Sequence, residues 1–271
     1  MADRFVLFSL PRCGSTTLMH LLNCHPDIRC THEPFNYKNT ELPICEPVED
    51  SETLDLLLDG LWERYNGVKH MYVPVGWPFR QGSTLNQHLL VRPGQKVILL
   101  HRRNLLQQIV SNQMALQSSV YQIRNAEDRG RITEFRFTPI SEKSLARMLA
   151  VWKRDIVNCR DLLSREGIAF LDLAYEELFG PALTTKHKRK ALKEIFVFLG
   201  RDPAAAGIDH MRMDALFDPA RSKVNSADTY RLVPGIERIE SLFGSRETGW
   251  LFKSSDRLPR ILQRLRGLGG G

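Results

Sequence analysis

The sequence lacks any apolar run that approaches the ~18 residues needed to cross a bilayer, so it predicts no transmembrane segment. It also has few cysteines, an odd number without CxxC spacing: Cys13, Cys24, Cys30, Cys45 and Cys159. We therefore expect free thiols in a reducing compartment and no metal site. A signal peptide is disfavoured, because its removal would cut away the first predicted strand, and we expect a cytoplasmic protein.

The chain also lacks the charge pattern of a nucleic-acid-binding protein. Its densest basic run, Lys186–Lys190, is not interleaved with aromatic residues and is typical of a solvated helix start. The formal net charge of +7 nevertheless suits an anionic ligand. We therefore expect sites for a small anion and no nucleic-acid partner. No pattern in the sequence predicts an oligomeric state.

The stretch Phe5–Leu22 predicts a strand, a tight loop and the start of a helix. Phe5–Ser9 is a short apolar run, and apolar residues return at helical spacing from Leu18. This order directs backbone N–H groups and the positive end of a helix dipole to one point. The alternative is an ordinary β–α turn with a Ser/Thr N-cap. The predicted anion loop consists of Arg12, Cys13, Gly14, Ser15, Thr16 and Thr17.

The residue types of the anion loop suit phosphate or sulfate. Arginine offers a rigid fork of donors, glycine permits close approach of the backbone, and hydroxyls donate hydrogen bonds. The loop lacks the Walker A pattern, which needs Gly-Lys-Ser/Thr, so ordinary ATP or GTP hydrolysis with Mg²⁺ is disfavoured. A thiol at this place, beside Arg12, can be acidified. The alternative for Cys13 is a small residue that fills a tight loop.

A second stretch, Lys96–Ser111, repeats the order of strand, basic residues and helix. Lys96–Leu100 is the clearest buried strand in the chain, and it runs into three basic residues that end at Arg103. Ser111 lies eight residues after Arg103, about two helical turns further on. Arg103 and Ser111 are therefore candidates to hold one anion between them. The alternative is an exposed Arg-Arg turn and a surface serine.

The short predicted strand Ile28–Thr31 is followed by His32 and Glu33. In parallel sheets, residues just beyond the carboxyl ends of the strands line the ligand crevice. Glu33 is therefore expected beside the anion loop if the first two strands are neighbours in the sheet. The alternatives for Glu33 are a solvated loop carboxylate and an ion pair with Lys69.

Predicted strands alternate with helices along the chain, which indicates a parallel sheet covered on both faces. The charged stretch Asn125–Pro139 is predicted to be an irregular loop or lid, and Ser141–Glu166 a long helix. No repeat or linker divides the chain. We expect an α/β fold: a single P-loop-like domain over residues 1–271, with a central parallel sheet flanked by helices and a frayed tail at 266–271. The five strands are predicted at 5–9, 28–31, 68–73, 96–100 and 168–173.

Two of these motifs together carry a family resemblance. Pro-Arg-Cys-Gly-Ser-Thr after a strand resembles the 5′-phosphosulfate loop of sulfotransferases that use PAPS (3′-phosphoadenosine 5′-phosphosulfate), and Arg103 with Ser111 resembles their 3′-phosphate motif. The chain is most similar to the bacterial carbohydrate type, which includes trehalose and Nod-factor sulfotransferases. Gly67–Lys69 and Glu166–Leu178 also resemble segments of that family. Cytosolic small-molecule sulfotransferases carry lysine where this chain has Arg12, and the arginine form occurs in the carbohydrate branch.

The resemblance implies a role for each candidate. Arg12 and the rest of the anion loop would hold the 5′-phosphate and stabilise its developing charge. Arg103 and Ser111 would hold the 3′-phosphate and so select PAPS over ATP. Glu33 would be the general base, with His32 as the alternative. The implied chemistry requires no metal, because protein cations neutralise the leaving group.

The implied reaction moves the sulfuryl group of PAPS to a hydroxyl of a carbohydrate, glycolipid or related small molecule, in line, and leaves PAP (adenosine 3′,5′-bisphosphate). Arg221 and Lys223 occupy the place of the family's C-terminal loop over the nucleotide and are further candidates for PAPS binding. The Arg-Lys-Gly motif of the cytosolic branch is absent from that loop. Two other functions stay open: a P-loop-related kinase that uses ATP, and a non-catalytic nucleotide-binding protein.

Overall fold

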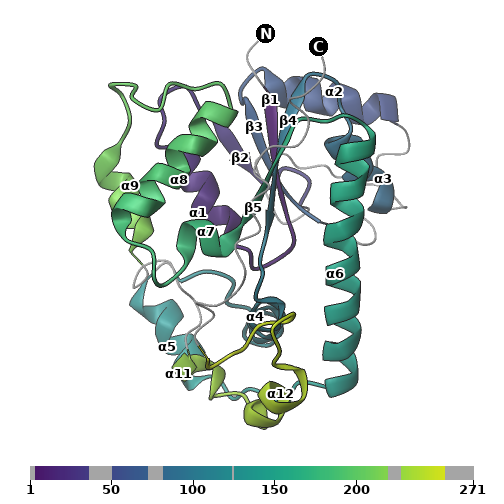
Figure 1. Cartoon of the computed structure of the whole chain (residues 1–271), viewed down its shortest axis with the longest axis vertical. Helices are drawn as coiled ribbons and strands as arrows, with labels where there is room; N and C mark the ends of the chain where they lie inside the picture. Colours follow the sequence, from purple (N-terminus) through teal and green to yellow (C-terminus); the bar gives the residue numbers. More distant parts are fainter. Residues whose placement is uncertain (1–3, 37–50, 73–81, 124, 219–226, 254–271) are drawn as a thin grey trace.

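The centre of the computed structural model is a parallel sheet with the strand order β2-β3-β1-β4-β5 (Figure 1). The structure describes residues 4–36, 51–72, 82–123, 125–218 and 227–253. The strands are β1 (Arg4–Ser9), β2 (Cys30–His32), β3 (Gly67–Met71), β4 (Gln95–His101) and β5 (Phe170–Ala174). The predicted α/β class and the five predicted strands are confirmed, with shifts of a few residues at their ends.

Alternate residues of the central strands point to opposite faces of the sheet and belong to two hydrophobic cores, one on each face. Phe5 and Leu7 of β1 belong to one core, and Val6 and Phe8 belong to the other. Because both faces are buried, β1 is apolar along almost its whole length. On the first face lie α1 (Ser15–Leu22), α7 (Tyr175–Phe179), α8 (Thr185–Phe198) and α9 (His210–Phe217) (Figure 1). On the second lie α2 (Ser51–Trp62), α3 (Gly82–Leu90) and α6 (Glu142–Arg165) (Figure 1).

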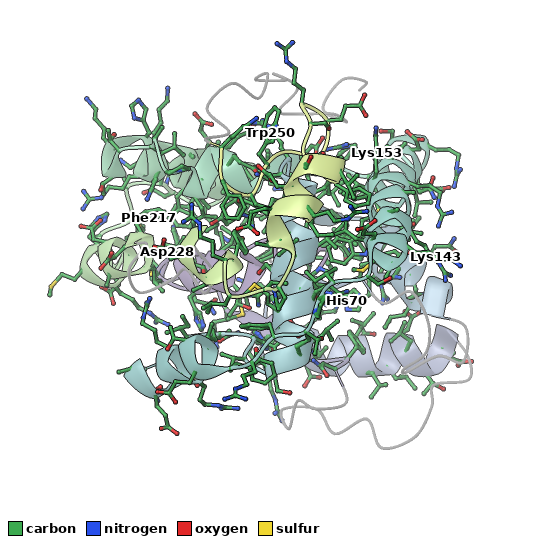
Figure 2. All side chains as sticks on the ribbon, turned by 90° about the horizontal axis from the view of Figure 1, so that it is seen from below. His70, Lys143, Lys153, Phe217, Asp228 and Trp250 are labelled. Atoms are coloured by element: carbon green, nitrogen blue, oxygen red, sulfur yellow. The ribbon has the colours of Figure 1, made fainter. Side chains whose placement is uncertain are left out.

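Four further helices gather beyond the carboxyl ends of the strands: α4 (Leu105–Ser118), α5 (Ala126–Glu134), α11 (Ala227–Tyr230) and α12 (Ile236–Phe243) (Figure 1). Seen from this end, Phe217 and Asp228 lie on one side of α4, and Lys143 and Lys153 of α6 lie on the other (Figure 2). The last described segment is tied to the start of α4, since the Leu106 N–H donates to the Thr248 carbonyl at 2.8 Å. These elements close off one end of the sheet.

The connections leave the sheet in opposite directions at β1 and β4. From β1 the chain passes through α1 toward β2, whereas from β4 it passes through α4, α5 and α6 to β5. Such a topological switch point opens a crevice at the carboxyl ends of the two strands. The turns after β1 and β4, which carry Arg12 and Arg103, therefore meet at one place.

One expectation about this end of the molecule is wrong, and one condition on which another depended is not met. The predicted loop at Asn125–Pro139 contains α5, because the Asn125 side chain caps it, accepting from the Asp128 N–H at 2.9 Å, and Ile132 anchors it in the core. The first two strands are not neighbours, because β3 lies between β1 and β2. The sequence of a single apolar strand does not specify which strand lies beside it, so no local pattern in the sequence predicted this strand order.

Candidate functional site

The anion loop leaves β1 through a tight turn with unusual backbone angles. Arg12 has φ 64° and Gly14 has φ 77°, both in the left-handed region. Gly14 is the N-cap of α1, and a Cβ there would lie 3.1 Å from the ring of Tyr175. The turn thus needs glycine at position 14 for both conformation and space. Arg12 has a Cβ, so the left-handed conformation strains its backbone. Backbone strain of this kind is found mainly at binding and catalytic sites.

The Arg12 side chain connects the two predicted anion motifs. Its Nε donates to the Ser111 hydroxyl of α4 at 3.1 Å, and its terminal nitrogen donates to the Tyr121 carbonyl. These bonds orient the guanidinium across the crevice between β1 and β4. The structure therefore brings Arg12 and Ser111 together, although they lie 99 residues apart.

In the structure, Arg103 contacts two acids of α7, whereas the Ser111 hydroxyl accepts from Arg12. The Arg103 guanidinium forms an ion pair with Glu177 of α7. Its backbone N–H and that of Asn104 both donate to the Glu176 carboxylate, each at 3.0 Å. The two acids of α7 therefore hold the turn after β4 by its backbone and by its side chain.

Arg102 is a member of the site that the sequence analysis left without a role. Its guanidinium lies 4.6 Å above the ring of Tyr175, a cation–π contact, and it donates to the Gln107 side chain at 2.6 Å. Tyr230 of α11 is buried close to Arg102: burial raises the pKa of its hydroxyl, and the charge of Arg102 opposes this shift. The only signal for Arg102 in the sequence was its place directly before Arg103, and this signal does not say which arginine enters the crevice.

The crevice holds the guanidinium groups of Arg12 and Arg102. Burial lowers the pKa of Arg102, but Tyr230, Tyr175 and Glu176 outweigh it and the pKa is raised. Among the described residues, no carboxylate oxygen lies within 4.0 Å of the Arg12 or Arg102 guanidinium. Burial, together with the charge of Arg102, lowers the pKa of Arg12. The buried Nε of Arg102 has no hydrogen-bond partner among the described residues. Two guanidinium groups, one of which has an unused Nε donor, therefore converge at the start of α1, which suits a bound anion.

Cys13 contributes its backbone to this loop, and its thiol is inert. The side chain is fully buried, and burial raises its pKa to about 12. Gln108 of α4 donates to the Pro11 carbonyl at 2.7 Å and to the Cys13 sulfur at 2.9 Å, and so fastens the loop to α4. The acidified thiol considered from the sequence is excluded, because a thiol with so high a pKa carries no negative charge at neutral pH. The four described cysteines are all free and buried.

Glu33 lies in a polar cluster at the carboxyl ends of β2 and β3. It has φ 44°, and its backbone N–H donates to the Lys69 carbonyl at 3.0 Å. Its carboxylate forms an ion pair with the ammonium group of Lys69, which is 1% exposed, and accepts from Asn36 at 2.8 Å. Burial favours the neutral acid, but Lys69 outweighs it and the pKa of Glu33 is lowered. Glu33 is therefore a carboxylate at neutral pH.

His32 joins the Glu33 cluster to the anion loop. Its Nε2 lies 3.4 Å from the Thr16 hydroxyl, 3.4 Å from the Lys69 ammonium and 3.9 Å from a Glu33 oxygen. Glu33 is thus two contacts away from the start of α1 even though β3 separates β1 from β2. The expectation that Glu33 lies near the anion loop holds through this route rather than through direct pairing of the strands.

A cavity of about 500 Å³ opens beside the anion loop and His32. Thr16 and His32 form part of its wall, and Gln122 donates to the Thr16 hydroxyl at 3.3 Å. Its volume is typical of a small-molecule site. The anion loop therefore contributes Arg12 to the crevice and Thr16 to the wall of this cavity. The remaining wall residues are Met19, His20, Asn23, Cys30, Thr31, Tyr65 and Arg212.

Two predicted nucleotide ligands, Arg221 and Lys223, lie outside the described residues. Tyr230, which is buried close to Arg102, follows them in α11. None of the described helices is long and apolar enough to cross a membrane.

Comparison with known proteins shows the following similarities. The family model described as Stf0 sulphotransferase matches residues 75–231, a range that contains Arg103 and Ser111. Nodulation protein H of Rhizobium meliloti (strain 1021) is 32% identical over 124 residues, 42% of this chain and 48% of that protein, so the match spans about half of the relative's length. A crystal structure of a mouse sulfotransferase complexed with PAP aligns with a TM-score of 0.40 and 18% identity, over 85% of this chain and 69% of that chain.

Proposed function

Because the chain belongs to the Stf0 sulfotransferase family, we propose that it transfers a sulfuryl group from PAPS to a hydroxyl of a carbohydrate, glycolipid or related small molecule. The observation that carries this proposal is the crevice at the start of α1, where Arg12 and Arg102 converge and neither forms an ion pair with a described carboxylate. The Glu33 carboxylate and a cavity of about 500 Å³ are connected to the anion loop through His32 and Thr16. The crevice thus suits an anionic donor, and the cavity suits an acceptor.

The residues present fit the phosphate groups of such a donor. The unused Nε of Arg102 and the guanidinium of Arg12 are donors of the kind that bind phosphate oxygens in a bidentate manner. The first backbone N–H groups of α1 point into the same crevice, since helix geometry leaves them without intrahelical acceptors. PAPS supplies the activated sulfuryl group and a bisphosphate leaving group. Arg12, Ser15, Thr16 and Thr17 would hold the 5′-phosphate.

We assign the 3′-phosphate to Arg103 and Ser111. In the structure Arg103 forms an ion pair with Glu177, and the Ser111 hydroxyl accepts from Arg12. In this proposal both side chains reach the crevice, and a phosphate replaces the neighbours that now hold their polar groups. Arg103 would exchange Glu177 for phosphate oxygens, and Ser111 would donate its hydroxyl hydrogen. Arg221 and Lys223 are proposed to close over the nucleotide.

We assign the general base to Glu33. Lys69 keeps its carboxylate ionised and fixed, so at neutral pH it is in the form that accepts a proton. His32 lies between Glu33 and Thr16 and is the alternative base. Arg12 stabilises the charge that develops on the leaving phosphate, in the same way as preorganised cations do in phosphoryl transfer.

The proposed function is tested by incubating the full chain with PAPS and a panel of sugars, glycolipids and other hydroxyl compounds. The expected result is a gain of about 80 daltons, the mass of SO₃, on one acceptor class, with equimolar release of PAP. Metal-dependent turnover of ATP would indicate a kinase instead. Binding of PAP without transfer to any acceptor would indicate a non-catalytic nucleotide-binding protein.

Replacing Arg103 tests the assignment of the 3′-phosphate. Arg103→Ala should weaken binding of PAP about 10- to 100-fold, because a charge-assisted hydrogen bond to a partly buried phosphate is lost. Binding of adenosine 5′-phosphate, which lacks the 3′-phosphate, should change less than twofold. Titration calorimetry with both nucleotides measures the difference. Arg165→Ala, at the end of α6 and exposed, is the matched control for loss of one positive charge. Equal losses for both nucleotides contradict the assignment.

A further inference from the structure

The cavity on the acceptor side has a charge that the proposed reaction does not explain. Its wall presents hydroxyl, amide and imidazole groups together with one guanidinium, that of Arg212 on α9. No aspartate or glutamate is among the described residues that line it. The Glu33 carboxylate is held by Lys69 and Asn36 beside the cavity and does not form its wall.

Arg212 presents its charge to the cavity without a compensating acid. Its side chain is exposed, and among the described residues no carboxylate oxygen lies within 4.0 Å of its guanidinium. Only its backbone N–H is held by an acid, donating to Asp209 at 2.9 Å as part of the N-cap of α9. Burial and then the charges of Arg212 and Lys69 lower the pKa of His20, which lines the same wall. Arg212 is thus the one cation among the described residues of this wall, and no described carboxylate pairs with it.

The cavity wall combines groups from elements that differ in chemistry. Thr16 and His32 mark the reacting part of the wall, because they adjoin the anion loop and the Glu33 carboxylate. Arg212 belongs to α9, a different element from those that carry the proposed reacting groups. A guanidinium in such a position recognises a carboxylate, phosphate or sulfate with two parallel hydrogen bonds. A neutral sugar would leave this charge without a counter-charge.

We propose that the acceptor carries an anionic group, in addition to the hydroxyl that receives the sulfuryl group, and that Arg212 binds it. This proposal rests on the proposed function and specifies the substrate class of the same site. The acceptor would be an acidic sugar or a phosphorylated or sulfated one. Arg212 sets specificity in this scheme and takes no part in the chemical step, so its removal should raise KM and leave kcat nearly unchanged.

The test compares acceptors that differ only in charge. Methyl glucoside and methyl glucuronide share their ring hydroxyls, and glucose 6-phosphate supplies a phosphate in place of the carboxylate. Binding of each to the full chain is measured by calorimetry with and without PAP, and transfer from PAPS is measured separately. We expect the anionic compounds to bind about fivefold more tightly than the glucoside, an advantage that falls as salt is added. A preference for glucuronide alone identifies a carboxylate site, and one for the phosphate alone identifies a phosphate site.

The variant Arg212→Gln should lose this preference, with unchanged affinity for PAP. Lys193→Gln, which removes an exposed charge of α8 outside the cavity wall, should keep it. Equal binding of neutral and anionic compounds to the wild-type protein would overturn the proposal. So would weaker PAP binding in Arg212→Gln, which would assign Arg212 to the donor. Absence of sulfate transfer with every acceptor would count against the proposed function instead, since the binding measurement needs no turnover.

Discussion

Replacing Arg12 with alanine should lower kcat/KM for sulfate transfer about 10³-fold. A single preorganised donor that stabilises developing charge contributes about 10²- to 10³-fold, and an arginine at a phosphoryl-transfer centre contributes more. Arg12 is placed for this role because Ser111 and the Tyr121 carbonyl fix its guanidinium in the crevice. Initial rates with PAPS and the best acceptor measure the effect. Circular dichroism establishes that the variant is folded.

Two further variants separate the charge of Arg12 from its shape. Arg12→Lys retains one positive charge and loses the planar fork, so we expect it to recover about tenfold of the lost rate. Arg4→Ala removes an arginine from the opposite end of β1, where it pairs with Asp59 at 3.7 Å, and should leave the rate within about twofold of wild type. A rate within tenfold of wild type for Arg12→Ala would rule out its role at the leaving phosphate.

The second large effect is expected at Glu33. Glu33→Gln should lower kcat about 10²- to 10⁴-fold, the usual contribution of a general base, with PAP affinity within about twofold of wild type. The substitution also removes the counter-charge of the buried Lys69, which costs stability. Lys69→Met is therefore the necessary comparison, since it breaks the same ion pair but keeps the carboxylate. If Glu33 serves only as the partner of Lys69, both variants will lose the same activity.

The pH dependence of kcat/KM separates the two candidate bases. The pKa of Glu33 is lowered, so the activity it supports should persist down to pH values below the ordinary glutamate range, about 4.3. The stabilisation from its ion pair is present above the pKa of glutamate in the unfolded chain, and it is lost as the pH falls through the folded pKa. In Lys69→Met, burial is opposed by Asn36 and His32 but no longer by Lys69, so the pKa of Glu33 should rise and the acidic limb should move to higher pH. A limb at about pH 6–7 that disappears in His32→Gln would identify a histidine base.

The parts of the site that are continuous in sequence could be predicted from it. Phe5–Ser9 is apolar because both of its faces are buried, and the loop that follows has the residue types of an anion site. The apolar strand β4 and the basic turn that ends at Arg103 could be predicted from the sequence in the same way. The strand order had no such signal, because pairing of parallel strands depends on long crossovers and not on local pattern. The ion pair of Glu33 with Lys69 was an alternative in the sequence analysis, and the contact of His32 with Thr16 was not predicted, because both depend on the strand order.

The residues that the sequence analysis missed reach the site from distant segments. Tyr175, Tyr230 and Arg212 come from α7, α11 and α9, and none stands in a motif with fixed spacing to Arg12. Arg102 is adjacent in sequence to the predicted Arg103. Its role depends on its contact with the Tyr175 ring and on its Nε, which has no hydrogen-bond partner among the described residues. Such a role is a property of the packed structure. The helix α5 was missed because its single buried anchor, Ile132, gives almost no periodic pattern.

The left-handed backbone at Arg12 and Glu33 has a consequence for engineering. An ordinary L-residue in this conformation costs about 1–2 kcal/mol, and glycine relieves that cost. A laboratory selection for heat resistance alone would therefore favour glycine at both positions and discard the guanidinium and the carboxylate. Mutant libraries made to raise the thermal stability of this protein should therefore keep Arg12 and Glu33 unchanged and vary other positions.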